Sequence, residues 1–147
     1  MTAFSLRSGA FADGGSIPSR HSCDGADESP ALDWVGAPEA TAAFALIVDD
    51  PDARGFVHWL AFDIPGEQAS LTEGASGGGG FGEGGNDFGR SGWRGPCPPS
   101  GTHRYAFELF ALDRALGLGG ATADELRRAM KGHVLGSAKL LGRYRRA

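Results

Sequence analysis

The sequence predicts an antiparallel β-sandwich, mainly β, with one or two short helices and long Gly/Pro-rich loops. Glycine accounts for 25 of the 147 residues, and this composition disfavours helix and permits many tight turns. Several short segments have the apolar or alternating pattern of strands, and turn residues separate them. Only one segment, near the C-terminal end, carries the signals of a helix. The length fits one domain covering residues 1–147.

Six segments have the length and pattern of β-strands. Alternation of apolar and polar side chains marks residues 2–6, 31–35 and 104–112. In the last of these, one side carries Tyr105, Phe107, Leu109 and Ala111. A continuous apolar run over 42–48 suits a strand that is buried on both faces. A further strand is expected over 56–64, where Pro65-Gly66 ends it, and a last one over 138–144.

One helix is expected after Thr122. The sequence Thr122-Ala-Asp-Glu125 is a capping box, in which the threonine hydroxyl and the glutamate carboxylate each accept from the other's backbone N–H. An apolar stripe follows at Leu126, Ala129 and Met130, and Gly132 fits the end of the helix.

Charge is distributed unevenly along the chain. The stretch from Arg127 to Ala147 has seven basic residues and no acidic ones, whereas residues 1–126 have 7 basic against 18 acidic residues, a balance of −11. A basic end can contact nucleic acid, anionic lipid or the acidic body of a second copy, which would make a homodimer. The simpler interpretation, which we favour, is a solvated helix face followed by a frayed tail. No nucleic acid is expected as the main partner, because the acidic body repels phosphate.

The two cysteines, Cys23 and Cys97, are too few for a disulfide scaffold. Reduced thiols in a cytoplasmic protein are therefore expected, although a single bridge stays open because both residues lie in loop-like segments. No C-x-x-C pair is present for a thiolate zinc site. The sequence also shows no apolar run of about 18 residues for a transmembrane segment and no secretory signal.

Polar side chains that could take part in binding or catalysis lie at the ends of predicted strands. Asp49, Asp50 and Asp52 follow the 42–48 strand, and they repel one another unless a cation, a donor network or a ligand relieves them. A surface Asp-Pro turn is the simpler interpretation. His58 lies inside the next strand, where a hydrogen-bonded core histidine is the commoner case. If the strands are neighbours, Asp50 and His58 can meet His103 at one pocket.

Three chemistries can use this set of side chains. Two histidines and a carboxylate can form a facial metal triad. Histidine and aspartate can activate a serine, but no G-x-S-x-G motif supplies one. Histidines and loop N–H groups can hold an anion while the aspartates hold a cation. Only the last needs no residue that the sequence lacks, and four glycines would let the backbone approach the ligand: Gly89, Gly92, Gly95 and Gly101.

A set of ordered motifs resembles a known family. The motifs are Asp50-Pro-Asp-Ala53, Phe56-Val-His-Trp59, Asn86-Asp-Phe-Gly-Arg-Ser-Gly92 and Gly95-Pro-Cys-Pro-Pro-Ser-Gly-Thr-His-Arg-Tyr105. Together they resemble the phosphatidylethanolamine-binding protein family, and more closely its bacterial, Raf kinase inhibitor-like branch. The resemblance covers roughly residues 16–144.

The resemblance implies a β-sandwich with a small preformed pocket for phosphate, phosphoethanolamine or a similar group. The ligand-binding residues that it implies are Asp50, Asp52, His58, Pro98, His103 and Tyr105. The two histidines would donate to the anion, and Asp50 would orient a histidine or meet an ammonium group. The family implies a binding or regulatory protein, including an inhibitor of a kinase or protease. It implies no enzymatic activity, cofactor or metal.

Two departures from the family pattern stand out, and two alternatives stay open. Arg54 replaces the family's usual proline, and the nearly pure glycine segment 77–85 is expected to be a mobile flap or spacer. One alternative is a protein–protein interaction module with a vestigial pocket. The other, less favoured, is a metal-dependent hydrolase that uses the aspartates and histidines.

Overall fold

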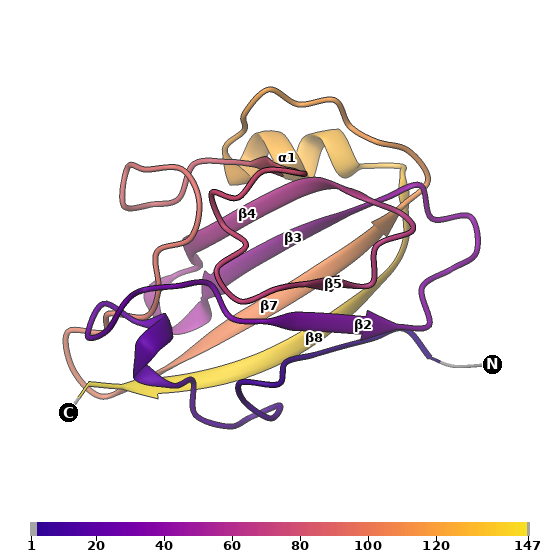
Figure 1. Cartoon of the computed structure of the whole chain (residues 1–147). Coiled ribbons are helices and arrows are strands. Elements are labelled where there is room, and N and C mark those ends of the chain that lie inside the picture. Colours follow the sequence, from indigo (N-terminus) through magenta and orange to yellow (C-terminus); the bar gives the residue numbers. More distant parts are fainter. Residues whose placement is uncertain (1–2, 147) are drawn as a thin grey trace.

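In a computed structural model of the chain, which describes residues 3–146, two antiparallel sheets pack face to face and one α-helix covers the outside of the larger sheet (Figure 1). The small sheet has the order β1 (Ser5–Arg7), β2 (Leu32–Val35), β5 (Ser70–Leu71). The large sheet has the order β6 (Gly82–Glu83), β4 (Phe56–Pro65), β3 (Ala43–Asp50), β7 (Thr102–Leu112), β8 (Val134–Arg145). The predicted β-sandwich is confirmed.

The central strand β3 is apolar on both faces because it separates two cores. Phe44, Leu46 and Val48 point toward the small sheet and join the core between the sheets. The alternate residues Ala45 and Ile47 point the other way, against the helix. Successive side chains of a strand face opposite sides, so two cores require a continuous apolar run. This explains the pattern at residues 42–48.

The helix α1 (Ala123–Met130) forms where the capping box predicts it. The Thr122 hydroxyl accepts from the Glu125 N–H at 3.2 Å, and the Glu125 carboxylate accepts from the Thr122 N–H at 2.9 Å. Leu126 and Met130 are buried against the large sheet. Gly132 follows the helix with φ of +84°, a left-handed conformation that glycine adopts without strain.

The basic C-terminal segment is more ordered than expected. Strand β8 pairs with β7 along its whole length, from Val134 opposite Leu112 to Arg145 opposite Thr102. The predicted last strand is therefore confirmed but longer, and the expectation of a frayed tail is wrong as far as Arg145. Pairing with the long neighbour β7 orders these arginines, which have little intrinsic preference for a strand.

A β-bulge interrupts β4 at His58. Val48 pairs with Trp59 and Asp49 pairs with Val57, which leaves His58 as an extra residue on β4. As a result Val57 faces the α1 side while Trp59 faces the core between the sheets. Without the bulge the two would share a face, since they are two residues apart. Bulges of this kind re-aim side chains at the ends of sheets.

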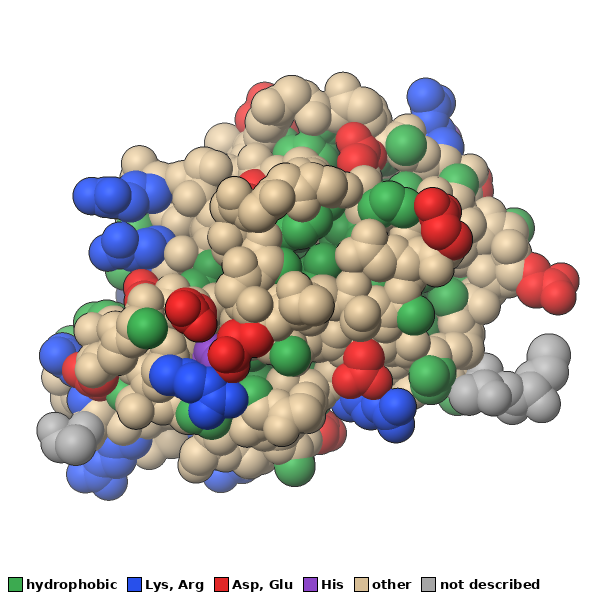
Figure 2. Space-filling view, viewed as in Figure 1, with side chains coloured by type: hydrophobic (Ala, Val, Ile, Leu, Met, Phe, Trp, Pro, Cys, Tyr) green, Lys and Arg blue, Asp and Glu red, His purple; other side chains and the backbone are tan. Residues whose placement is uncertain are grey.

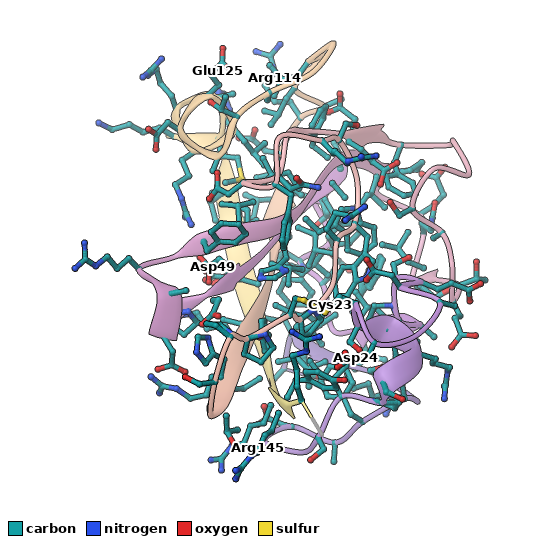
Figure 3. All side chains as sticks on the ribbon, turned by 90° about the vertical axis from the view of Figure 1, so that its left-hand side faces the viewer. Cys23, Asp24, Asp49, Arg114, Glu125 and Arg145 are labelled. Carbon is teal, nitrogen blue, oxygen red and sulfur yellow. A yellow bond between two sulfur atoms is a disulfide. The ribbon has the colours of Figure 1, made fainter. Side chains whose placement is uncertain are left out.

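The two cysteines form a disulfide, Cys23–Cys97, with their Cα atoms 5.4 Å apart. The expectation of reduced thiols is therefore wrong. The bond joins the segment after η1 (Ser19–His21) to the proline-rich loop before β7, at the end of the sandwich that Figure 3 shows face-on. The two segments are far apart in sequence, so no local pattern could establish their contact.

The glycine-rich segment 77–85 is anchored by one carboxylate. Glu83 accepts hydrogen bonds from the Trp59 indole at 2.8 Å, from the Ser76 hydroxyl at 2.5 Å and from the Gly77 N–H at 2.7 Å. Gly82 and Glu83 also pair with β4 as the edge strand β6. The predicted flap is thus tied to the sheet at its second half.

Candidate functional site

A small cavity of about 160 Å³ lies at the end of the core between the sheets, where β3 ends and β7 begins. Five of the residues that line the cavity were predicted from the sequence to bind a ligand: Asp50, His58, Pro98, His103 and Tyr105. The others are Ala53, Phe56, Phe88, Cys97 and Pro99. Figure 1 shows this end of the sheet on its left-hand side.

The three aspartates after β3 separate to three different partners. Asp49 faces α1, where Arg127 lies 3.7 Å away, and burial raises the pKa of Asp49. Asp50 contacts His103, and Asp52 contacts Arg104. Each carboxylate has its own counterpart, which relieves the repulsion that their spacing in the sequence implies.

Asp52 lies beside the cavity and is absent from its walls. Its carboxylate accepts from the backbone N–H of Arg104 at 2.8 Å and from the guanidinium at 2.8 and 3.1 Å. These bonds from Arg104 lower the pKa of Asp52 to about 2. Asp52 therefore ties η2 (Pro51–Ala53) to β7, and we assign it a positioning role.

Asp50 is buried and uses both carboxylate oxygens. Oδ2 accepts from Nδ1 of His103 at 2.6 Å, and Oδ1 accepts from the N–H of Asp52 at 2.8 Å. Because a carboxylate can only accept, Nδ1 of His103 carries the proton. Asp50 thereby sets the orientation of the imidazole and leaves its Nε2 for another partner.

His58 is held in an equivalent way by the backbone. Its Nδ1 donates to the carbonyl oxygen of Arg94 at 2.6 Å, so that this nitrogen also carries the proton. The side chain is buried, and burial lowers the pKa of His58, although the Arg94 carbonyl and the Asp50 charge oppose the shift. Within residues 3–146, neither His58 nor His103 makes a hydrogen bond through Nε2.

Aromatic rings fix the position of His58. Phe56, Phe88 and Tyr105 lie edge-to-face with the imidazole at centroid distances of 5.4, 5.3 and 5.2 Å. Burial raises the pKa of Tyr105, so its hydroxyl is neutral. Phe88 is 38% exposed at the cavity, and the Arg94 guanidinium stacks over it at 5.7 Å. Sequence reasoning missed both phenylalanines as wall residues, although each belongs to a quoted motif.

The glycines near the cavity serve packing more than ligand approach. A side chain at Gly95 would collide with the His21 carbonyl and the Asp27 carboxylate, which accepts from the Gly95 N–H at 2.7 Å. At Gly92 it would meet the Ser76 hydroxyl. Packing alone thus accounts for glycine at these two positions, and the approach of an anion to them stays a prediction. They allow close contact between two parts of the protein.

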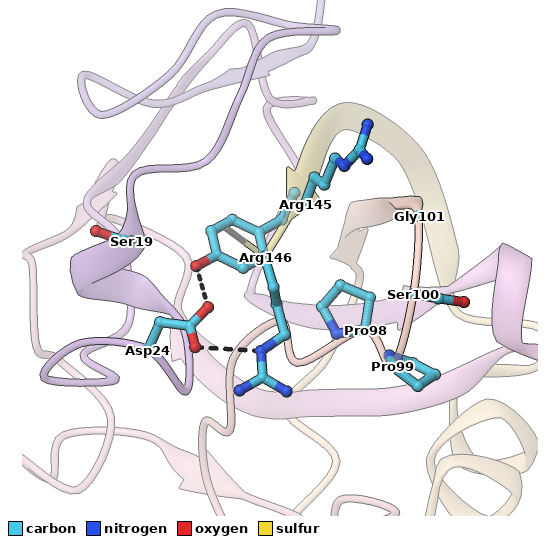
Figure 4. Close-up of a pocket in the computed structure, with 9 residues that line it drawn as sticks. Ser19, Asp24, Pro98, Pro99, Ser100, Gly101, Arg145 and Arg146 are labelled. Carbon is cyan, nitrogen blue, oxygen red and sulfur yellow. Dashed lines mark hydrogen bonds and ion pairs between the residues drawn. The ribbon is translucent and has the colours of Figure 1, made fainter.

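A second, larger hollow of about 730 Å³ lies on the other side of the same proline pair (Figure 4). Pro98 and Pro99 line both spaces and so form the wall between them. In the larger hollow, Asp24 accepts from the Tyr144 hydroxyl and from Arg146. Arg145 also lines it, and basic side chains are numerous at this end of the molecule (Figure 2).

Two further observations bear on the hypotheses made from the sequence. In the part of the chain that the structure describes, no three His, Cys, Asp or Glu side chains gather in a way that can hold a metal ion. The facial triad hypothesis therefore gains no support from geometry. Among residues 3–146, no helix is long and apolar enough to span a membrane.

Comparison with known proteins places the chain in a family. The model of the phosphatidylethanolamine-binding protein family matches residues 7–145. The chain belongs to the phosphatidylethanolamine-binding protein family. The resemblance seen in its motifs is thereby confirmed, and the cavity residues lie within the matched region.

Relatives and solved structures agree with this placement. A UPF0098 protein of Methanothermobacter thermautotrophicus is 50% identical over 96% of this chain and 98% of its own length. A phosphatidylethanolamine-binding protein homologue of Chlamydia trachomatis superimposes with a TM-score of 0.94 at 35% identity, with both chains fully covered. YbcL of Escherichia coli, described as a member of the same family, gives 0.89 at 28% identity, covering 99% of this chain and all of YbcL.

Proposed function

We propose that the cavity binds a phosphate-like oxyanion, either free or as a headgroup such as phosphoethanolamine. The observation that carries the proposal is the matched arrangement of two imidazoles. His58 and His103 each commit Nδ1 to a fixed acceptor, the Arg94 carbonyl and the Asp50 carboxylate, and both rings line the same cavity. Each Nε2 is left for a ligand, and protonation turns it into a donor that suits an oxyanion.

The size of the cavity supports a small ligand. Pockets for drug-sized molecules usually exceed about 300 Å³, whereas this one is about 160 Å³. One water occupies about 30 Å³ of liquid, so the space suits a group of about five non-hydrogen atoms. A phosphate has that number. The remainder of a larger molecule would extend past Phe88, which is partly exposed at the cavity.

Protonation governs the strength of binding in this proposal. With its pKa lowered by burial, His58 is neutral in the free protein and presents a lone pair at Nε2. An anion favours the imidazolium, which donates from both nitrogens. Binding therefore brings a proton to the site, and the affinity rises as the pH falls. This agrees with the role of donor that the family resemblance implies for His58.

The hydrogen bonds of Asp50 favour one of its two implied roles, which are to orient a histidine or to meet a ligand ammonium group. Both of its oxygens already accept hydrogen bonds, from His103 and from the Asp52 N–H. Its buried charge is paired with an imidazole, so it does not face a ligand ammonium as an unpaired anion. We therefore propose that Asp50 orients His103, and that the oxyanion alone provides most of the recognition.

We also propose that the protein acts by binding, as a regulatory or inhibitory protein of the cytoplasm. The walls of the cavity include no serine or threonine, and their only cysteine is in a disulfide. The walls therefore offer no serine or threonine hydroxyl and no free thiol as a nucleophile. A kinase or protease as the protein partner follows from the family resemblance, and a homodimer would fit the unequal charge distribution.

Titration calorimetry with inorganic phosphate and with phosphoethanolamine tests this function. We expect both to bind the wild type and to protect its fold, by about 2.7 kcal/mol at 100 times the dissociation constant. His58→Ala and His103→Ala should abolish binding. His133→Ala is the matched control, because His133 also donates Nδ1 to a carboxylate, that of Asp113, but lies outside the cavity. Tighter binding of phosphoethanolamine would assign a headgroup, equal binding would assign phosphate itself, and no binding of either would refute the proposal.

A further inference from the structure

The wall between the two hollows depends on a single covalent link. Within the described chain, residues 97–101 form no backbone or side-chain hydrogen bond with any other residue. The preceding residues are tied, because Gly95 donates to Asp27 and the Pro96 carbonyl accepts from the Cys23 N–H at 3.1 Å. The next fixed point is Thr102, where β7 begins. Between these points only the Cys23–Cys97 disulfide joins the loop to the rest of the protein.

The same loop supplies one side of the proposed anion site. Cys97, Pro98 and Pro99 line the cavity together with His103, the imidazole that Asp50 orients. Proline carries no N–H and cannot donate a stabilising hydrogen bond of its own. Apart from packing of the buried Pro98 ring, the position of the two prolines against the cavity is therefore set by the cysteine that precedes them.

The disulfide is also open to reagents on one side. Cys23 is exposed and takes no part in lining the cavity, whereas Cys97 is only partly exposed and forms part of its wall. An external thiolate therefore reaches the Cys23 sulfur more readily. Attack at an exposed sulfur with displacement of the buried one is the usual course of thiol–disulfide exchange.

We propose that Cys23–Cys97 is a redox switch for the anion pocket, an inference that rests on the proposed function. The thiolate of a small dithiol attacks the Cys23 sulfur, forms a mixed disulfide and releases the Cys97 thiolate. The second thiol of the reagent then closes its own disulfide and releases Cys23. The protein gains two electrons and, after protonation, two protons, and the dithiol is oxidised. Residues 97–101 are then free to leave the cavity wall.

In the cytoplasm, the location proposed above, such a bond would meet reducing dithiols. Disulfides in reducing compartments are rare, and those that exist there are usually transient or sensing bonds. A permanent structural staple is the competing explanation. The two differ in what reduction does to the folded protein. A switch loosens the loop while the sheets stay in place, whereas a staple contributes only to global stability and leaves the folded loop where it is.

Calorimetry with inorganic phosphate at 25 °C separates these explanations. We expect dithiothreitol to weaken phosphate binding by the wild type about tenfold, the effect of losing one preorganised wall. Oxidised glutathione should restore it. Cys23→Ser should bind as weakly as the reduced wild type and should not respond to dithiothreitol, and it replaces no residue of the cavity wall. Equal affinity of the oxidised and reduced wild type would overturn the switch.

Nitrogen-15 relaxation of the backbone provides a readout that needs no ligand. Reduction should lower the order parameters of Ser100 and Gly101, from about 0.85 for a rigid backbone to below about 0.6, and leave those of β3 and β4 unchanged. Unchanged order parameters at these two residues, or lower ones throughout the sheet, would each contradict the switch. If the oxidised protein fails to bind phosphate at all, the proposed function fails, and the relaxation result alone decides whether the bond controls the loop.

Discussion

The Oδ2 atom of Asp50 lies 2.6 Å from Nδ1 of His103, and this contact joins the end of β3 to the start of its neighbour β7. The same carboxylate accepts from the Asp52 N–H at the start of η2. One buried side chain thus fixes both the turn that closes the cavity and an imidazole that lines it. The shape of the site therefore depends on this residue.

Replacing Asp50 by asparagine tests that dependence. Asparagine keeps an oxygen for the Asp52 N–H but places an NH₂ group against Nδ1 of His103, so two donors face each other. We expect the unfolding free energy to fall by about 1–3 kcal/mol, the usual effect of leaving a buried donor unpaired. Urea denaturation measures this loss, and phosphate affinity should fall with it.

Asp113→Asn is the control for the Asp50 substitution. Asp113 also accepts from a histidine Nδ1, that of His133 at 2.9 Å, but this pair is partly exposed. Solvent can satisfy the groups that the substitution unpairs, so stability should hardly change. Equal losses from the two variants would show that burial of Asp50 has no special importance.

The buried state of His58 predicts a pH dependence of stability. Burial lowers the pKa of His58 below its ordinary value of about 6.5, so the folded protein binds fewer protons here than the unfolded chain. This contribution is complete above about pH 6.5 and falls as the pH drops toward the folded-state pKa, by up to about 1.4 kcal/mol per pH unit. Urea denaturation from about pH 5 to 8, without phosphate, measures it. His58→Asn should remove this part of the slope of unfolding free energy against pH. An identical slope in the variant would show that other titrating groups cause it.

The affinity for phosphate should have the opposite pH dependence to the His58 contribution to stability. Because the bound anion favours the imidazolium, the wild type should take up protons on binding phosphate near pH 7, and its affinity should fall as the pH rises. Calorimetry in two buffers of different ionisation enthalpy measures the uptake. Affinity that stays constant from about pH 5 to 8 would mean that groups other than imidazoles hold the anion.

The sequence predicted the strands and the helix because their signals are local. Alternation placed Tyr105 and Phe107 on the core face of β7, and the capping box placed the start of α1. The doubly buried run at 42–48 was interpreted correctly for the same reason, since a strand between two cores needs apolar residues at every position. The strand assignments and the ordered motifs then predicted that Asp50, His58 and His103 share one pocket, and all three line the same cavity.

The features that sequence reasoning missed arise from contacts between distant segments. The bulge at His58 exists only in the pairing of β4 with β3. The disulfide joins residues 74 positions apart, and Gly95 is required by the carbonyl of His21. The roles of Phe56 and Phe88 depend likewise on which ring packs on which, which no spacing in a single chain reveals.

Loss of the disulfide should also lower global stability. The bond closes a loop across 74 positions, so its removal gives the unfolded chain more conformational entropy. We expect Cys23→Ser to lower the unfolding free energy by about 2–4 kcal/mol. Urea denaturation with and without dithiothreitol measures it, and the reagent should affect the wild type alone. A change in the variant would point to an effect of the reagent other than reduction of this bond.

The carboxylate of Glu83 should be the main anchor of the glycine-rich segment. It accepts from Trp59, Ser76 and Gly77, and at about 1 kcal/mol per bond Glu83→Ala should cost about 2–3 kcal/mol. Thermal unfolding measures the loss. Glu67→Ala removes an exposed glutamate and serves as the control. A melting temperature of Glu83→Ala equal to that of the control would show that segment 77–85 is held by its backbone alone.

Nitrogen NMR of the histidine side chains during titration with inorganic phosphate tests the central claim most directly. We expect the Nε2 signals of His58 and His103 to move together and to saturate at one dissociation constant, because both nitrogens would contact the same anion. The signals of His133, which lies outside the cavity, should stay in place. Unchanged Nε2 signals of His58 and His103 at saturating phosphate, or shifts of the same size at His133, would contradict an anion site between the two imidazoles.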